Sequence, residues 1–284
     1  MAYRVGRRED LARGLLRLLR EDLDGAAQDL RGSGRRDERI HQVRQRLKRI
    51  RTILRVLEPA FGQRAVAARR ALSEAARLLA RARDADVAAA SAHALAASVA
   101  VHDDPGFDRI ADTLDREAER AHAERTPIGE VTMRLASAGA LATSFKPDFD
   151  GATLLRSALR KTYAKGRAAM RRAETSLATP DLHQWRKQVK QLWYLLRLTR
   201  KRLPGSTKTR ARRLEKLGEL LGLDHDHAML AEKLALSPTA DLSLMSQLGV
   251  ISKRRQTLEA EAFDRGARLY AKKPKAFALR LALR

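Results

Sequence analysis

"HQVRQRLKRIRTILR", residues 41–55, places an apolar side chain at every third or fourth position and fills the positions between with cations. This spacing is typical of a helix with two unlike faces, because successive residues turn by about 100°. The apolar face consists of Val43, Leu47, Ile50 and Leu54. The opposite face, an arc of about 60° at that helical turn, consists of His41, Arg44, Lys48 and Arg55. The stretch therefore predicts a helix that buries one side and presents cations on the other.

The same pattern returns 142 residues later as "HQWRKQVKQLWYLLR", residues 183–197. Its cations are His183, Arg186, Lys190 and Arg197, and its apolar face is Trp185, Val189, Leu192 and Leu196. Without a gap, the same offset also pairs Arg70 with Arg212, Leu79 with Leu221 and Asp84 with Asp226. Such agreement over a fixed offset predicts a duplicated helical unit.

The rest of the chain favours helices as well. Ala, Leu, Arg and Glu dominate, and no stretch alternates with the period of two that is typical of strands. Helix-breaking residues fall at 31–37, 58–62, 102–107, 125–129, 145–151, 178–181, 203–208 and 237–243, which predicts about eight to ten helices. We expect an all-α protein of two pseudo-symmetric helical bundles, residues 1–145 and 150–284, with about four helices each and a basic central groove between them.

We call the two sets of cations stripes: the first stripe is His41, Arg44, Lys48 and Arg55, and the second is His183, Arg186, Lys190 and Arg197. Local signals set the expected limits of the helix that carries the second stripe. Thr179 is a suitable N-cap, Pro180 suits the first helical position, and Asp181 suits the first turn. Pro204 and Gly205 supply the next strong stop. We therefore expect a helix that begins after Thr179 and continues to this stop.

Charge indicates the kind of partner. The 58 Lys and Arg against 34 Asp and Glu leave a net charge of +24, and residues 151–284 carry +19 of it. Such a field attracts polyanions. With no cysteine, thiolate chemistry and disulfides are excluded. No apolar run reaches the roughly 18 residues of a membrane span, and the apolar helix faces are needed for the cores, so we expect a cytoplasmic protein that does not bind membranes.

The cationic stripes lack the acidic neighbours that normally accompany surface cations. Residues 44–55 contain no Asp or Glu, although a surface helix usually mixes signs at i,i+4. The second stripe is preceded by another basic helix, which a short connection should place antiparallel beside it. The cations of this preceding helix are Arg160, Lys161, Lys165, Arg167, Arg171 and Arg172. Several cationic helices along one groove would hold phosphate groups.

These residues carry a resemblance to a known family. Four features of the chain are the pattern H-x-x-R-x-x-x-K in each half, "LLARARDADV" at 78–87, "LLGLDHDHAML" at 220–230 and "RLYAKKPKAFALRL" at 268–281. In these features the chain resembles the CHAD family, the conserved histidine α-helical domain. The resemblance covers nearly the whole chain. It implies two similar helical bundles around a basic groove that binds inorganic polyphosphate, in some organisms at polyphosphate granules. The binding set it implies is His41, Arg44, Lys48, Arg51, Arg55, His183, Arg186, Lys187, Lys190 and Arg197.

One position departs from the family pattern. The family usually has an arginine ten residues after each histidine, and Arg51 follows this pattern in the first copy. The second copy has Trp193 there instead. The two halves are therefore not expected to contribute equally to binding.

Physical chemistry favours the same ligand. A phosphate polymer offers regularly spaced negative charge, which arginine and lysine bind through charge-assisted hydrogen bonds. We expect His183 and His41 to gain protons when a polyanion binds, and therefore tighter binding at pH 6 than at pH 8. Nucleic acid is the alternative ligand. It fits less well, because aromatic residues for base stacking make up only 4% of the chain and do not interleave with the stripes.

An enzyme is the third reading, and the sequence gives it little support. The "DHDH" stretch, residues 224–227, places His225 and His227 about 200° apart on a helix, so the two cannot chelate one metal. Asp84 and Asp226 are expected to anchor neighbouring arginines. No P-loop, G-x-S-x-G or H-E-x-x-H motif occurs. We expect a non-catalytic binding protein with no cofactor and no metal.

Overall fold

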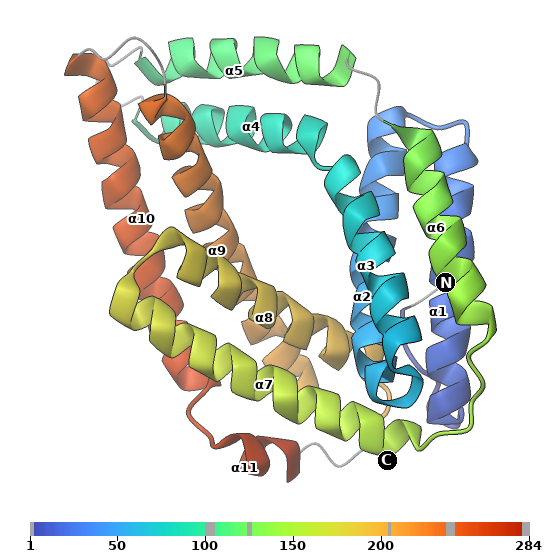
Figure 1. Ribbon diagram of the computed structural model, residues 1–284. Helices are drawn as coiled ribbons and strands as arrows, with labels where there is room; N and C mark the ends of the chain where they lie inside the picture. Colours follow the sequence, from blue (N-terminus) through green and yellow to red (C-terminus); the bar gives the residue numbers. More distant parts are fainter. Residues whose placement is uncertain (1–2, 100–105, 124–126, 204–205, 237–241, 280–284) are drawn as a thin grey trace.

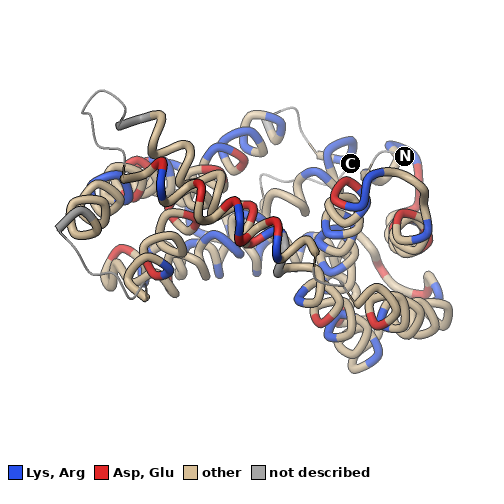
Figure 2. Tube along the Cα trace, turned by 90° about the horizontal axis from the view of Figure 1, so that it is seen from above, with Lys and Arg blue, Asp and Glu red and all other residues tan. Residues whose placement is uncertain are grey.

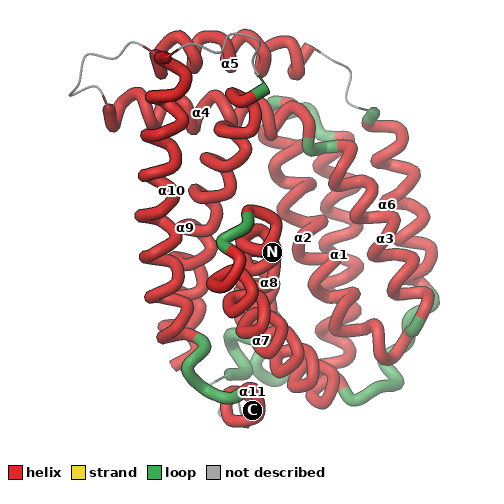
Figure 3. The backbone as a smooth tube through the Cα atoms, turned by 60° about the vertical axis from the view of Figure 1, so that its left-hand side comes forward, coloured by secondary structure: helices red, strands yellow, loops and turns green. Residues whose placement is uncertain are grey.

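The computed structural model describes residues 3–99, 106–123, 127–203, 206–236 and 242–279 (Figure 1). Within these ranges the chain forms eleven α-helices and no β-strand (Figure 3), which confirms the all-α prediction. The helices are α1 (Leu11–Arg31), α2 (Arg36–Phe61), α3 (Gln63–Leu78), α4 (Arg81–Val99), α5 (Gly106–Ala123), α6 (Ile128–Thr143), α7 (Gly151–Ser176), α8 (Thr179–Leu198), α9 (Ser206–Ala235), α10 (Leu242–Leu269) and α11 (Pro274–Leu279).

The helix count exceeds the expected eight to ten because the chain also breaks at two places outside the predicted ones, between α3 and α4 and between α10 and α11, and the first of these carries no Gly or Pro. Leu79 ends α3, and the next amide, that of Ala80, bonds to the Arg77 carbonyl only three residues back. Arg44 Nη1 donates to the freed Leu79 carbonyl oxygen at 2.6 Å. A guanidinium from another helix thus satisfies a carbonyl at a helix end. A break stabilised by a distant side chain leaves no local signal in the sequence.

The helix that carries the second stripe has different limits from those expected. Helix α8 already includes Thr179, and Ala178 precedes it without a side-chain cap. The Thr179 hydroxyl instead accepts a hydrogen bond from Arg255 Nη2 of α10 at 3.3 Å, so tertiary contact takes the place of capping. At the other end α8 stops at Leu198, where Thr199 caps it, well before Pro204.

One large core joins both halves of the chain. Helices α1, α2, α3 and α6 pack together, and α8 packs between α7 and α9. The apolar faces of the two stripes are buried in this core, since Val43, Leu47, Ile50 and Leu54 and their counterparts Trp185, Val189, Leu192 and Leu196 are all at most 1% exposed. Because the core is continuous, the division into residues 1–145 and 150–284 stays a prediction.

Helices α4 and α5 form an arm with a second core. They pair with each other and reach across to α9 and α10 (Figure 1). Ala92 and Phe107 of the arm are buried against Leu230 and Ile251 of α9 and α10. Acidic and basic positions both occur along α5 (Figure 2), whereas α4 carries no Asp, Glu, Lys or Arg after Asp86. The arm therefore links the two halves at the end opposite α7 and α8.

The order of the helices follows the 142-residue offset. When 142 is added to the residue numbers of α1, α2, α5 and α6, their ranges overlap those of α7, α8, α10 and α11, in that order. The same shift places α3 and α4 together on α9. The one difference in this order is that α9 runs unbroken where α3 and α4 are separate. This agreement supports the inferred duplication of a helical unit.

The C-terminal tail of the described chain is docked on α7. Phe277 of α11 stacks on Tyr163 with ring centroids 3.9 Å apart, and the Tyr163 hydroxyl donates to the carbonyls of Leu269 and Lys272. None of the helices in the described part of the chain is both long and apolar enough to cross a membrane.

Candidate polyanion-binding site

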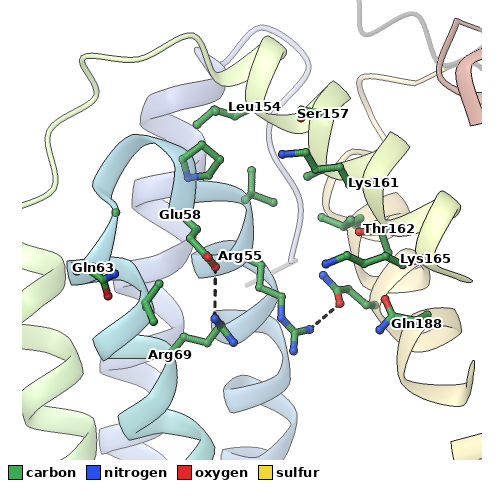
Figure 4. Close-up of a pocket in the computed structure, with 17 residues that line it drawn as sticks. Arg55, Glu58, Gln63, Arg69, Leu154, Ser157, Lys161, Thr162, Lys165 and Gln188 are labelled. Atoms are coloured by element: carbon green, nitrogen blue, oxygen red, sulfur yellow. Dashed lines mark hydrogen bonds and ion pairs between the residues drawn. The ribbon is translucent and has the colours of Figure 1, made fainter. Parts of the chain in front are cut away.

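Two pockets lie between the halves of the molecule. The upper pocket, about 900 Å³, is lined by α2, α8 and α9 and by the two helices of the arm, α4 and α5. The lower pocket, about 710 Å³, is lined by α2, α3, α7 and α8 (Figure 4). Helices α2 and α8 line both pockets, and these are the helices that carry the two stripes.

The stripe of α2 supplies cations to both pockets. Arg44 and Lys48 line the upper pocket, and Arg55 lines the lower one. A spacing of seven residues between Lys48 and Arg55 is about two helical turns, so both side chains leave the helix on the same side. Residues 41–55 therefore form a cationic edge that runs from one pocket to the other.

Cations from three helices meet around Lys48. Burial, and then the positive charges of Arg44, Arg83, Lys190 and Arg186, lower the pKa of Lys48 to about 8. These four neighbours come from α2, α4 and α8. Solvent still reaches Lys48, which lines the upper pocket, while the surrounding protein removes part of its hydration. The two stripes thus converge.

The lower pocket combines cations with amides. Arg55 Nη1 donates to Gln191 Oε1 of α8 at 2.7 Å, which joins the two halves directly (Figure 4). Burial, together with Arg51 and Arg69, lowers the pKa of Arg55 to about 10. Lys161 and Lys165 enter from α7. Four side chains from three helices can therefore donate hydrogen bonds to one anion here.

The two stripe histidines have different surroundings. His183 lines the upper pocket and lies against His225 of α9, with ring centroids 4.2 Å apart. Burial, then the nearby His225, Lys187 and Arg186, lowers the pKa of His183 to about 4, so its imidazole is neutral near pH 7. His41 is exposed, and its Nε2 lies 2.7 Å from Gln45 Nε2 on the same helix. It lines neither pocket.

Carboxylates also enter the upper pocket, although the stripes themselves contain none. Asp226 Oδ1 lies 3.7 Å from Arg186 Nη1, so Asp226 contacts a neighbouring arginine as expected. Asp84 also lines the pocket, where the charges of Arg44 and Arg83 act on it. The cations of the upper pocket are therefore partly neutralised by residues of other helices.

Several predicted residues lie apart from both pockets. Helix α7 presents Lys161 and Lys165 to the lower pocket, whereas Arg160 lines a separate pocket beside α11. At 100° per residue, Arg167 and Arg171 lie on the same face as Arg160. On α8, the Arg197 guanidinium lies 4.5 Å from the Trp193 ring centroid. Lys190 also approaches that ring, at 5.6 Å, and both therefore make cation–π contacts.

Arg51 and Lys187 line neither pocket but lie close to residues that do. Burial lowers the pKa of Arg51, with Arg69 of the lower pocket as the next cause. Lys187 is exposed, and its charge acts on His183 and His225. Both positions therefore add positive potential beside the two pockets.

The structure adds residues that the sequence pattern did not indicate. Arg69 and Gln191 line the lower pocket, and Arg83 and His225 line the upper one. Arg83 and His225 occupy equivalent positions, since they differ by 142 residues. The fixed offset could have pointed to them, because each directly precedes one of the paired residues Asp84 and Asp226.

The geometry agrees with the comparison to known proteins. The family described as CHAD domain matches residues 14–235. The chain belongs to the CHAD domain family. The crystal structure of the CHAD domain from the plant Ricinus communis is similar, with a TM-score of 0.54 and 18% identity over 96% of this chain and 91% of that chain. No curated protein sequence matches the chain.

The two pockets of this CHAD domain are lined by several cations. Among the described residues, no group of three or more His, Cys, Asp or Glu side chains is arranged to hold a metal ion. The residues that line the two pockets are instead suited to charge-assisted hydrogen bonds with an anion.

Proposed function

We propose that this CHAD domain binds inorganic polyphosphate without catalysis, in the groove formed by the upper and lower pockets. The observation that carries the proposal is the convergence of cations from α2, α4 and α8 around Lys48. Mutual repulsion and lost hydration make such a cluster unfavourable in the free protein, and a bound polyanion relieves both. Binding of this kind leads us to expect a cytoplasmic protein, with polyphosphate granules as one place where it would be found.

The shape of the site favours a chain over a single anion. The cations extend from Arg44 and Arg186 in the upper pocket to Lys161 and Lys165 in the lower pocket. A linear polymer can contact both groups at once, whereas a single phosphate can reach only one. Arginines supply paired donors and lysines supply point charges along this path.

Nucleic acid is the weaker candidate. No Phe, Tyr or Trp lines either pocket among the residues that the structure describes. Trp193 is half-buried, packs edge-on against Tyr194 and is flanked by Lys190 and Arg197. Single-strand binders gain about 1–3 kcal/mol for each base stacked on an aromatic ring, and the pockets offer no such surface.

The test is a competition measurement. Labelled long-chain polyphosphate is bound at several salt concentrations and displaced by unlabelled polyphosphate or by single-stranded DNA of equal phosphate number. We expect polyphosphate to compete at least tenfold better, and the logarithm of the affinity to fall linearly with the logarithm of the salt concentration. Equal competition by DNA would overturn the assignment of the ligand.

A variant pair tests the location of the site. Lys48→Ala/Arg55→Ala removes two groove cations, and Arg265→Ala/Arg268→Ala removes two exposed cations of α10 that pair only locally with Glu261 and Asp264. Both variants lose two positive charges. We expect the groove variant to lose about tenfold or more in affinity and the α10 variant about twofold or less, because screened charges outside the groove contribute little. Equal losses would place binding elsewhere.

A further inference from the structure

Two carboxylates occupy equivalent places in the cationic groove. Asp84 and Asp226 differ by the 142-residue offset, and both line the upper pocket. Arg44 and Arg186, which also correspond to each other, line the same pocket. Each half of the chain therefore brings one stripe arginine and one carboxylate to a single space. A site that only had to attract phosphate would not need these carboxylates.

The contact of Asp226 with Arg186 is long and single. One oxygen lies 3.7 Å from one guanidinium nitrogen, beyond hydrogen-bond distance. The nearby pair of Asp224 and Arg255 makes a closer contact. Asp224 is 1% exposed and accepts a hydrogen bond from Arg255 Nε at 2.8 Å. Asp224 therefore has a structural partner, whereas Asp226 is only loosely engaged in the pocket.

The electrostatics agree with a loose contact. Burial raises the pKa of Asp226, and the attraction of Arg186 and Arg83 does not offset it fully because Asp84 and Asp224 repel the charge. Burial likewise raises the pKa of Asp84. The charged or titratable groups that line the same pocket are Arg44 and Lys48 of α2, Arg83 of α4, Glu117 and Arg120 of α5, His183 and Arg186 of α8, and His225, Glu232 and Lys233 of α9.

We propose that Asp84 and Asp226 are internal counter-anions, which a bound phosphate chain displaces from the groove arginines and which thereby select long chains over short ones. This inference rests on the proposed function. In the free protein the two carboxylates reduce the positive potential beside Arg44 and Arg186. When polyphosphate occupies the groove, its oxygens replace them as partners of these arginines.

The selectivity follows from competition with a tethered group. A carboxylate held in the pocket competes at an effective concentration on the order of millimolar or above. A short phosphate must displace it with only the few contacts that the upper pocket provides. A long chain is also held by Arg55, Lys161 and Lys165 in the lower pocket, so it can stay bound in states in which the carboxylates are not displaced, and its affinity depends less on the displacement.

The experiment compares the affinities for triphosphate and for long-chain polyphosphate in three proteins. These are the wild type, Asp84→Asn/Asp226→Asn, and the control Glu261→Gln/Asp264→Asn. The control removes two carboxylates from surface pairs of α10 and so gives the same change in net charge. Thermal unfolding of each protein in the absence of ligand shows whether the fold is retained.

We expect the groove variant to bind triphosphate about tenfold more tightly than the wild type, and the long chain at most threefold more tightly. The control should change either affinity by less than twofold. A groove variant that binds triphosphate no better than the control, or more weakly, would overturn the inference and show that the carboxylates position the arginines. A wild type that fails to retain long chains would instead overturn the proposed function.

The pH dependence supplies a second readout. Protonation of Asp84 and Asp226 releases the arginines, so the affinity of the wild type for triphosphate should rise as the pH falls into the raised titration range of these carboxyls. The Asn variant should show a smaller rise in affinity, because it lacks these two titrating carboxyls. All its other titrating groups are those of the wild type. Parallel pH profiles of the two proteins would contradict displacement of a carboxylate.

Discussion

Lys48 shows how the surroundings change the chemistry of a single side chain. The sequence predicts a stripe lysine that would be fully charged at neutral pH. In the folded protein, burial and four neighbouring cations lower its pKa to about 8. Lys48 is therefore partly neutral slightly above neutral pH, where an isolated lysine with a pKa near 10.4 is charged.

This pKa predicts a pH dependence of binding. As the pH rises from 7 to 9, Lys48 of the free protein loses its proton, so the affinity for polyphosphate should fall by several-fold. Lys48→Arg should retain its charge over this interval and bind with a flatter profile. Titration of both proteins by fluorescence anisotropy at constant ionic strength measures the difference. Identical slopes would exclude Lys48 as the titrating group.

Protonation of His183 in the free protein does not explain tighter binding at pH 6 than at pH 8. The pKa of His183, lowered to about 4, leaves its imidazole neutral at both values in the free protein. Because His183 binds fewer protons when folded than when unfolded, this residue makes the fold less stable as the pH falls from about 6.5 to 4. Lys48, with a pKa of about 8, contributes to the expected increase in affinity between pH 8 and pH 6.

At the scale of one element, α7 shows that a basic helix can divide its cations between two faces. Lys161 and Lys165 are one turn apart and line the lower pocket. Arg160 lies toward α11, and Arg167 follows it by two turns on the same side. From the sequence of α7 alone, all four cations are equally good candidates for binding the ligand.

The two faces of α7 can be compared directly. Lys161→Ala/Lys165→Ala should weaken polyphosphate binding by about tenfold, because it removes two donors from the lower pocket. Arg160→Ala/Arg167→Ala loses the same charge from the other face and should weaken binding by about twofold or less. Isothermal titration calorimetry of the two variants measures both values. A greater loss in the arginine variant would place the ligand on the α11 side.

At the scale of the whole molecule, the arm forms one side of the upper pocket. Phe107 is 1% exposed in the small core that joins α4 and α5 to α9 and α10. This core is separate from the large one that holds the two stripes. The arm can therefore loosen while the stripes remain in place.

A core substitution tests whether the arm is an independent unit. Phe107→Ala should reduce the stability of the arm by about 3–5 kcal/mol. Hydrogen exchange should become faster in α4 and α5 and stay slow in α2 and α8, because the large core is untouched. Exchange that accelerates equally in all four helices would show that the two cores unfold together.

The sequence determined the helices and the faces of the stripes. The eight predicted breaks all fall at helix ends, and the apolar faces are buried, since helical periodicity and turn residues are local properties. Local properties also placed Arg44, Lys48, His183 and Arg186 on the polar sides of their helices, and all four line the upper pocket.

Only the tertiary structure decided which charges meet. The sequence did not reveal that Arg44 bonds the end of α3, that His225 lies against His183, or that Asp226 approaches Arg186. The pKa of Lys48 likewise depends on Arg83 and Lys190, which are distant in the chain. Electrostatic interactions act through space and depend on burial, so they become defined only when helices from both halves are packed together.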